Sequence, residues 1–123
     1  MNIKTDDSFL SLERVGSPRL NPVWRIRAAV AKQGCLVAVH GRTRVRTSDR
    51  TPDQVAKFVA HRAQRLELTL SDGGWLRLKR TLPGRTLIRY RFGPLLAGAT
   101  LEGEVRLEGE SAKACCRELQ GLL

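Results

Sequence analysis

Arginine recurs at every second position near the end of the stretch CLVAVHGRTRVR, residues 35–46. Alternate side chains of a β-strand point to opposite faces, so a strand over these residues would bury one set and expose the other. The exposed set would hold, in a row, His40, Arg42, Arg44 and Arg46. Guanidinium groups make paired hydrogen bonds to carboxylates and phosphates, so the chemistry that this row suits is the recognition of an anion.

Three more stretches alternate apolar and basic residues in the same way: VWRIRAAVA (23–31), WLRLKR (75–80) and TLIRYRF (86–92). Together with residues 35–46, they predict four strands that contribute to one basic, solvent-facing surface. The ten side chains that we predict to bind a partner there are Arg25, Arg27, His40, Arg42, Arg44, Arg46, Arg77, Lys79, Arg89 and Arg91.

The charge of the chain agrees with a basic surface. The 123 residues carry a net charge of +10, and their pI is about 10.8. Residues 1–100 hold 19 basic and 7 acidic side chains, or +12, whereas residues 101–123 hold 3 and 5, or −2. Hydrophobic residues make up 41% of the chain, which is enough for a packed core, so we predict one globular domain over residues 1–123.

The residue types that serve catalysis or bind metals are few in this sequence. Cys35 and His40 belong to opposite faces of one predicted strand and cannot meet, and His61 lies in a predicted helix. The sequence contains no GxSxG, HExxH or P-loop pattern, and its three cysteines have no zinc-site spacing. We therefore predict buried cysteine thiols, no metal, no cofactor and no enzymatic activity.

The elements that must position the arginines follow from capping signals and periodicity. Thr51 and Gln54 predict a capping box, Pro52 suits the first turn of a helix, and the apolar spacing after them predicts a helix over 52–65. Residues 111–120 predict a second, short helix. Strands are predicted over 9–15, 23–31, 35–46, 66–70, 75–80, 86–92 and 101–108.

Short turns join most of these strands. Lys32-Gln33-Gly34, Ser71-Asp72-Gly73-Gly74 and Leu82-Pro83-Gly84-Arg85 predict tight turns, the last of type II, whereas residues 16–22 predict an irregular connection. The order of elements predicts an α+β fold, with a curved antiparallel sheet of about six or seven strands. One mid-chain helix and one short C-terminal helix are expected to cover one face of this sheet.

Three interpretations of the basic surface compete at this stage. In the first, it is only solvated, and its arginines pair across strands with the outward glutamates of the stretch 101–108. In the second, it binds the backbone of RNA or DNA, although Trp24, Tyr90 and Phe92 are predicted to point into the core and leave no aromatic platform for bases. In the third, it binds an acidic protein through arginine–carboxylate pairs.

The order of parts resembles a family of small bacterial proteins of the toxin-immunity kind. The features that carry the resemblance are an L-x-L element at residues 10–12, a strand pair, a D/P-capped helix with Phe58 at its middle, and the hairpin SDGGWLRLKR at 71–80. The resemblance implies an immunity protein, or antitoxin, that occludes a toxin and carries no catalytic residue. Because this chain is basic, the partner would be a toxin domain with an acidic face, and nucleic acid is the alternative partner.

Two further observations bear on location. The N-terminal residues MNIKTDDSF lack the basic-then-apolar layout of a signal peptide, and the apolar run at 35–39 is far too short to span a bilayer. We therefore expect a cytoplasmic protein that has no membrane partner.

Overall fold

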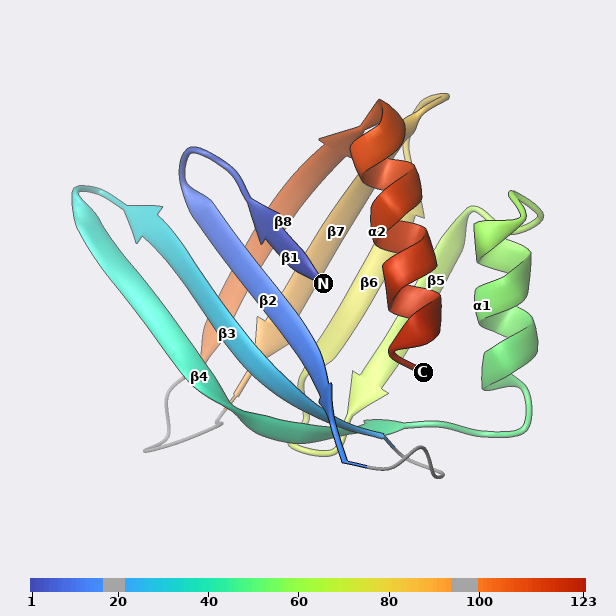
Figure 1. Ribbon diagram of the computed structural model, residues 1–123. Helices are drawn as coiled ribbons and strands as arrows, with labels where there is room; N and C mark the ends of the chain where they lie inside the picture. The colour runs from blue at the N-terminus through green and yellow to red at the C-terminus, as the bar shows by residue number, and fades with distance from the viewer. Residues whose placement is uncertain (17–21, 94–99) are drawn as a thin grey trace.

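The computed structural model describes residues 1–16, 22–93 and 100–123, which form an eight-stranded antiparallel sheet and two helices (Figure 1). Neighbouring strands pair in chain order from β1 to β8. The strands are β1 (Asn2–Lys4), β2 (Ser8–Val15), β3 (Val23–Lys32), β4 (Cys35–Arg46), β5 (Arg65–Leu70), β6 (Trp75–Arg80), β7 (Arg85–Phe92) and β8 (Leu101–Glu108). The helices are α1 (Thr51–Val59) and α2 (Gly109–Gly121).

The antiparallel sheet and the two helices agree with the sequence prediction, but the predicted count of six or seven strands is wrong. The strand that the prediction missed is β1, which has three residues and pairs with residues 9–11 of β2. Only Ile3 of β1 is buried, so this segment contains no alternation long enough to identify a strand. The irregular connection predicted over 16–22 lies mostly outside the described residues.

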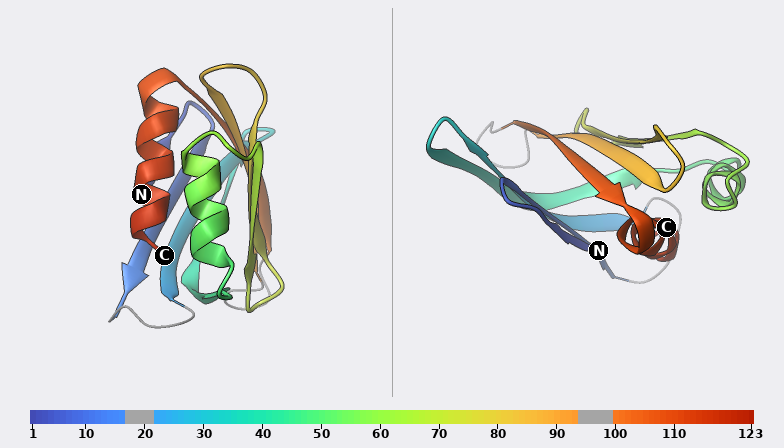
Figure 2. Two further views of the ribbon diagram at one scale, coloured as in Figure 1. Left: turned by 90° about the vertical axis from the view of Figure 1, so that its right-hand side faces the viewer. Right: turned by 90° about the horizontal axis from the view of Figure 1, so that it is seen from above.

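Strand β4 joins the two halves of the sheet. Residues 35–44 pair with β3 across a two-residue turn, in which Gln33 and Gly34 have φ angles of 49° and 79°. Two successive positive φ angles match the right-handed twist of a hairpin, as the sequence predicted for this turn. Val45 and Arg46 pair instead with β5. The sheet folds over at this point, which places β1–β3 in one layer and β5–β8 in a second (Figure 2).

The hydrophobic core lies between the two layers. Helix α2 covers the part of the β5–β8 layer that β1–β3 leave open, and α1 lies beside β5 at the edge (Figure 1). The Trp24 indole Nε1 donates a 3.1 Å hydrogen bond to the Leu122 backbone oxygen, which ties β3 to the end of α2. The largest fully buried side chains come from both layers and from both helices: Trp24, Tyr90, Phe58, Phe92, Leu10, Leu12, Ile26, Leu70, Leu76, Leu78, Ile88 and Leu119.

Helix α1 ends earlier than predicted. Its last residue is Val59 rather than residue 65, because His61 adopts a left-handed φ of 62° and the chain turns back on itself. The amides of Arg62 and Ala63 both donate to the Lys57 backbone oxygen, which closes the end of the helix. This early end places His61 in the wall of a cleft described below.

The predicted capping box at the start of α1 is also wrong. The residue before the helix is Arg50, whose side chain makes no capping hydrogen bond, and Thr51 lies inside the helix. The Thr51 hydroxyl accepts a 2.9 Å hydrogen bond from the Ser48 amide instead. Pro52 does occupy the first turn, as predicted.

Helix α2 includes the predicted residues 111–120 and is slightly longer. It buries the face formed by Ala112, Cys115, Cys116 and Leu119, as its spacing predicted. The turn before β7 is also confirmed, since Gly84 has a φ of 75° and the Arg85 amide donates to the Leu82 backbone oxygen at 2.9 Å.

Candidate partner-binding surface

The fold divides the ten predicted binding residues between two surfaces that point away from each other. Both layers turn their apolar faces to the core, so their outer faces lie on opposite sides of the molecule (Figure 2). The β2–β4 face, as we name the outer side of the first layer, holds Arg25, Arg27, His40, Arg42 and Arg44. The β5–β8 face, the outer side of the second layer, holds Arg77, Lys79, Arg89 and Arg91.

Arg46 lies at the bend between these faces, opposite Thr69 of β5. The structure therefore corrects the expectation of one common basic surface. A continuous sheet keeps the alternation of its strands across the bend, but the bend turns the two halves in different directions.

The β2–β4 face has more positive than negative groups at close range. In the strand register, Arg25 lies opposite Arg42, and Arg27 lies opposite His40. Glu13 of β2 lies on the same face and pairs with Arg25 at 3.5 Å. In the described part of the chain, the other arginines of this face make no ion pair. Like charges that face each other across strands repel, so the placement of Arg25 opposite Arg42 is unfavourable in the isolated protein.

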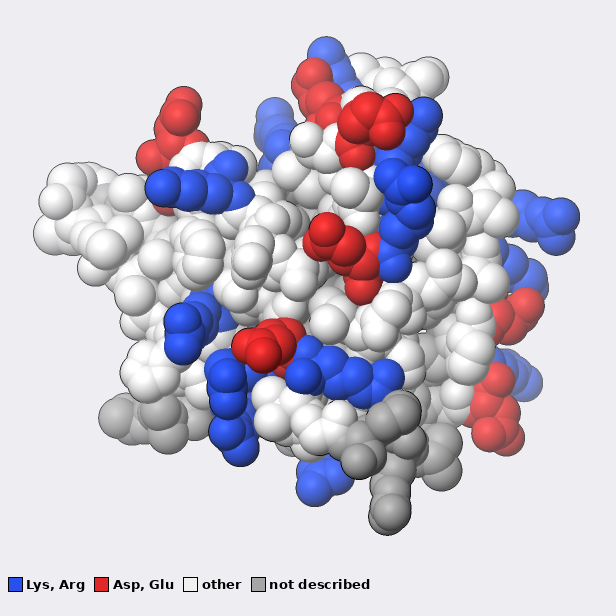
Figure 3. Space-filling model, viewed as in Figure 1, with Lys and Arg blue, Asp and Glu red and all other residues white. Residues whose placement is uncertain are grey.

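An apolar patch continues this face towards the tip of the β3–β4 hairpin. Leu36 is opposite Ala31, and the two are exposed together with Ala38. Leu36 is 73% exposed on this face, whereas Val37, which is 40% exposed, lies on the opposite side of the hairpin ribbon. A contiguous exposed apolar patch, unlike a single exposed residue, is typical of interaction surfaces. Figure 3 shows this surface: uncharged atoms cover the hairpin tip, and Lys and Arg side chains gather over the lower part of β2–β4.

The sequence predicted that Cys35 and Val37 would be buried on the inner side of β4, and this prediction is wrong. The strand pairs of β2 with β3 begin at Ser8 and Val30, so the rest of the hairpin extends past β2. Nothing in the described chain covers either side of this projecting ribbon, and both residues are exposed. One residue in the sequence could have indicated an uncovered apolar surface here: Leu36, an apolar residue on the same strand face as the arginines.

The β5–β8 face carries a ladder of ion pairs. Arg77 pairs with Glu67 at 3.4 Å. Arg91 pairs with Glu102 at 3.6 Å, across the strands as the solvated interpretation predicted.

Two more ion pairs belong to this ladder. Arg85 pairs across the strands with Glu108 at 3.0 Å. Glu104 lies opposite Arg89 in the register, but its ion pair at 3.9 Å goes to Arg106 of its own strand. Four glutamates therefore offset much of the positive charge on this side of the protein.

One aromatic residue lies among the cations of the β5–β8 face. Trp75 is half-buried, and the Arg77 guanidinium carbon lies 3.9 Å from the centre of its ring. The predicted inward aromatics Trp24, Tyr90 and Phe92 are all buried. Because Arg77 already covers the exposed ring, this face offers no free stacking platform for bases within the described residues.

The three thiols are in contrasting environments. Cys115 and Cys116 are buried in α2, as predicted, whereas Cys35 is exposed. Burial raises the pKa of Cys115 to about 12, with a smaller contribution from neighbouring Cys116. No group of three or more His, Cys, Asp or Glu side chains within the described ranges is placed to hold a metal ion.

Comparison of the chain with protein-family models, with curated proteins and with solved structures finds no match. The resemblance to toxin-immunity proteins therefore depends only on the order of the sequence elements. Neither of the two described helices is long and apolar enough to cross a membrane.

Proposed function

We propose that this chain is a non-catalytic binding protein whose β2–β4 face docks an acidic protein. The observation that carries the proposal is the combination of arginines without carboxylate partners and an exposed apolar patch on one continuous face. Protein interfaces are enriched in arginine and have an apolar centre, and this face has both features. A face that is only solvated accounts for the arginines but not for the exposed apolar patch of Ala31, Leu36 and Ala38.

The two parts of the face would have different roles in binding. Leu36, with Ala31 and Ala38 on the same face, lies near the projecting hairpin tip and would enter an apolar depression of the partner. Arg27, Arg42 and Arg44 would pair with carboxylates around it, and their field would speed association with an acidic surface. In this arrangement, the partner also relieves the repulsion between the facing cations.

We further propose that the partner is a bacterial toxin domain and that the protein acts as an immunity protein by occluding it. Support for this step comes from the order of sequence elements described above. A cytoplasmic location is part of the same proposal, since the protein would meet its toxin inside the cell.

The direct test uses the product of the adjacent open reading frame as the partner and isothermal titration calorimetry as the measurement. We expect the wild-type chain to bind it and Arg42→Glu with Arg44→Glu to weaken binding by about 2–5 kcal/mol. The matched control is Lys79→Glu with Arg89→Glu, which makes the same change of net charge on the opposite face, using two cations that are free of ion pairs in the described structure. Equal losses in both variants would show that only net charge matters and would contradict the proposed surface.

Nucleic acid is the competing partner, and a mobility-shift assay separates it. The chain is mixed with RNA and with DNA at 50 and at 200 mM salt. Binding that falls steeply between these concentrations would favour phosphate recognition over protein docking, because released counterions make such binding salt-dependent. We expect little binding at 200 mM, since the described faces offer no uncovered aromatic platform between the arginines.

A further inference from the structure

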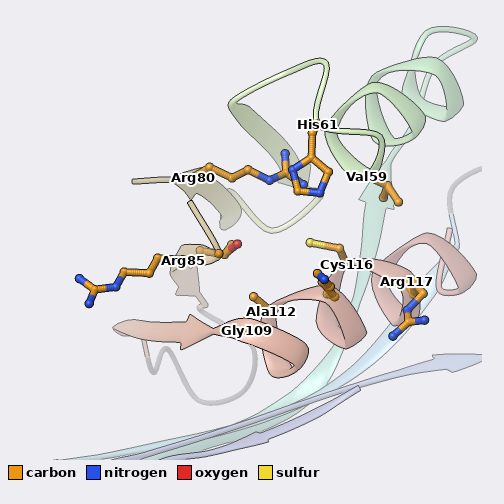
Figure 4. Close-up of a pocket in the computed structure, with 11 residues that line it drawn as sticks. Val59, His61, Arg80, Arg85, Gly109, Ala112, Cys116 and Arg117 are labelled. Carbon is orange, nitrogen blue, oxygen red and sulfur yellow. The ribbon is translucent and has the colours of Figure 1, made fainter. Parts of the chain in front are cut away.

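A cleft of about 460 Å³ lies apart from both outer faces, between the end of α1, the β6–β7 turn and the first half of α2 (Figure 4). Its volume falls in the range of small-molecule sites. Val59 and Ala112 form apolar parts of its wall, and His61, Arg80 and Cys116 contribute polar groups. None of these residues belongs to the surface proposed above.

Arg80 is the fixed cation of this cleft. It is the last residue of β6 and is half-buried, and its Nη1 donates a 2.9 Å hydrogen bond to the Ala63 backbone oxygen. Its guanidinium carbon also lies 4.0 Å from the centre of the Phe58 ring, a cation–π contact that holds the group against the C-terminal end of α1. In the described residues, Arg80 has no ion-pair partner, so its charge is not neutralised by the protein.

The other cations at the cleft are placed differently. Arg85 pairs with Glu108 at 3.0 Å, and Lys113 pairs with Glu110 at 3.5 Å. In Figure 4, the side chains of Arg85 and Arg117 point away from the cavity, whereas those of Arg80 and His61 extend over it. The left-handed backbone at His61, with its φ of 62°, is what turns the chain so that the imidazole reaches the cleft.

Cys116 lies in the wall opposite, and its sulfur points into the cavity (Figure 4). Burial raises the pKa of this thiol, and the positive charge of Arg80 only partly opposes the effect. The thiol therefore stays protonated near neutral pH and is a poor nucleophile. The chemistry of the cleft is binding rather than covalent reaction.

We propose that this cleft binds a small molecule that carries an oxyanion, a phosphate or a carboxylate, on an apolar body. The Arg80 guanidinium would receive the oxyanion through its free N–H groups, because its fork geometry matches such groups. Val59 and Ala112 would contact the apolar body. The inference stands independently of the proposed function, since it uses different residues on a different side of the molecule.

The test is a titration of the ¹⁵N-labelled chain, followed by NMR, with three probes of similar size: phenyl phosphate, benzoate and benzyl alcohol. We expect the anions to shift the amides of His61, Ala112 and Cys116, and the neutral alcohol to bind at least about 10-fold more weakly. Binding of phenyl phosphate alone would assign the head group as phosphate, and binding of both anions would assign an oxyanion in general.

Variants then locate the binding. Arg80→Gln should weaken phenyl phosphate binding at least about 10-fold, and Arg80→Lys, which keeps the charge, should retain part of it; the ¹⁵N spectrum of each variant checks that it is folded. Arg85→Gln and Arg117→Gln are matched controls, because their side chains point away, and they should bind like the wild type. Absence of anion binding, equal binding of benzyl alcohol, or equal loss in the Arg117→Gln control would overturn the proposal.

Discussion

The two outer faces of the folded sheet are built from the same kind of strand, yet they differ in how their charge is balanced. On the β5–β8 face, glutamates of β5 and β8 flank the arginines and pair with them at 3.0–3.9 Å. On the β2–β4 face, the described ion pairs reduce to one, between Glu13 and Arg25. The exposed apolar residues near the hairpin tip adjoin the β2–β4 face and not the β5–β8 face.

This difference shows that a count of arginines does not identify a docking surface. Exposed ion pairs contribute little to stability, but they neutralise a face and lower its attraction for an anionic partner. What distinguishes the β2–β4 face is the lack of neutralisation together with the exposed apolar patch around Leu36. Predictions that separate the two faces should therefore change one of these features at a time.

The largest expected effect is a difference in thiol reactivity. Iodoacetamide at pH 8 should label Cys35, at the projecting tip of the β3–β4 hairpin, at least about 100-fold faster than Cys115, because burial and the raised pKa of Cys115 leave little thiolate to react. Peptide mass spectrometry over a time course measures each rate. Equal labelling of the three thiols in the folded protein would mean that the tip is covered or that α2 opens readily. Denaturant should remove the difference, which is the internal control.

A smaller but more specific effect, on partner binding, is expected when an exposed leucine is replaced in the β3–β4 hairpin and, as a control, in the β6–β7 turn. Leu36→Asp should weaken binding of the partner by about 2 kcal/mol or more, because a buried carboxylate would replace the apolar contact. Leu82, in the β6–β7 turn, is 56% exposed, and Leu82→Asp makes the same change of charge away from the proposed surface. The control should bind within about 0.5 kcal/mol of the wild type. Both variants should keep the wild-type melting temperature, which circular dichroism would check.

The contrast between these faces also indicates which part of the site was predictable. The outward positions of β3, β4, β6 and β7 were predicted correctly, because alternation along a strand is a local property of the sequence. Each of the ten predicted side chains is exposed or, for Arg25, half-buried. The direction in which a strand face points was not predictable, because it depends on the fold of the sheet. The sheet folds where β4 changes its pairing partner, from β3 up to Arg44 to β5 at Val45 and Arg46. Residues 35–46 contain no local signal for this change.

The length of the uncovered β3–β4 hairpin could not be predicted either, because it also depends on contacts between distant parts of the sequence. Whether Val37 is buried depends on where β2 starts relative to β3, and the register of Ser8 with Val30 is a contact between residues far apart in sequence. The cleft beside α1 was missed because the predicted helix continued to residue 65, whereas α1 ends at Val59 and the turn after it places His61 at the cleft. Helix periodicity and the first residues of a following strand cannot be separated by pattern alone.

The smallest expected effect tests whether neutralisation itself distinguishes the two faces. Glu13→Gln and Glu67→Gln each remove one carboxylate and one exposed ion pair, so they raise the net charge equally. Each should change the free energy of unfolding by only about 0.2–1 kcal/mol. Glu13→Gln frees Arg25 on the β2–β4 face and should speed association with the proposed acidic partner by a few-fold at low salt, whereas Glu67→Gln should leave the rate nearly unchanged. Stopped-flow measurements at 20 and 200 mM salt would resolve this difference. If the two variants accelerate association equally, the field of the whole protein guides the partner, and the local balance of charge on the β2–β4 face has no special role.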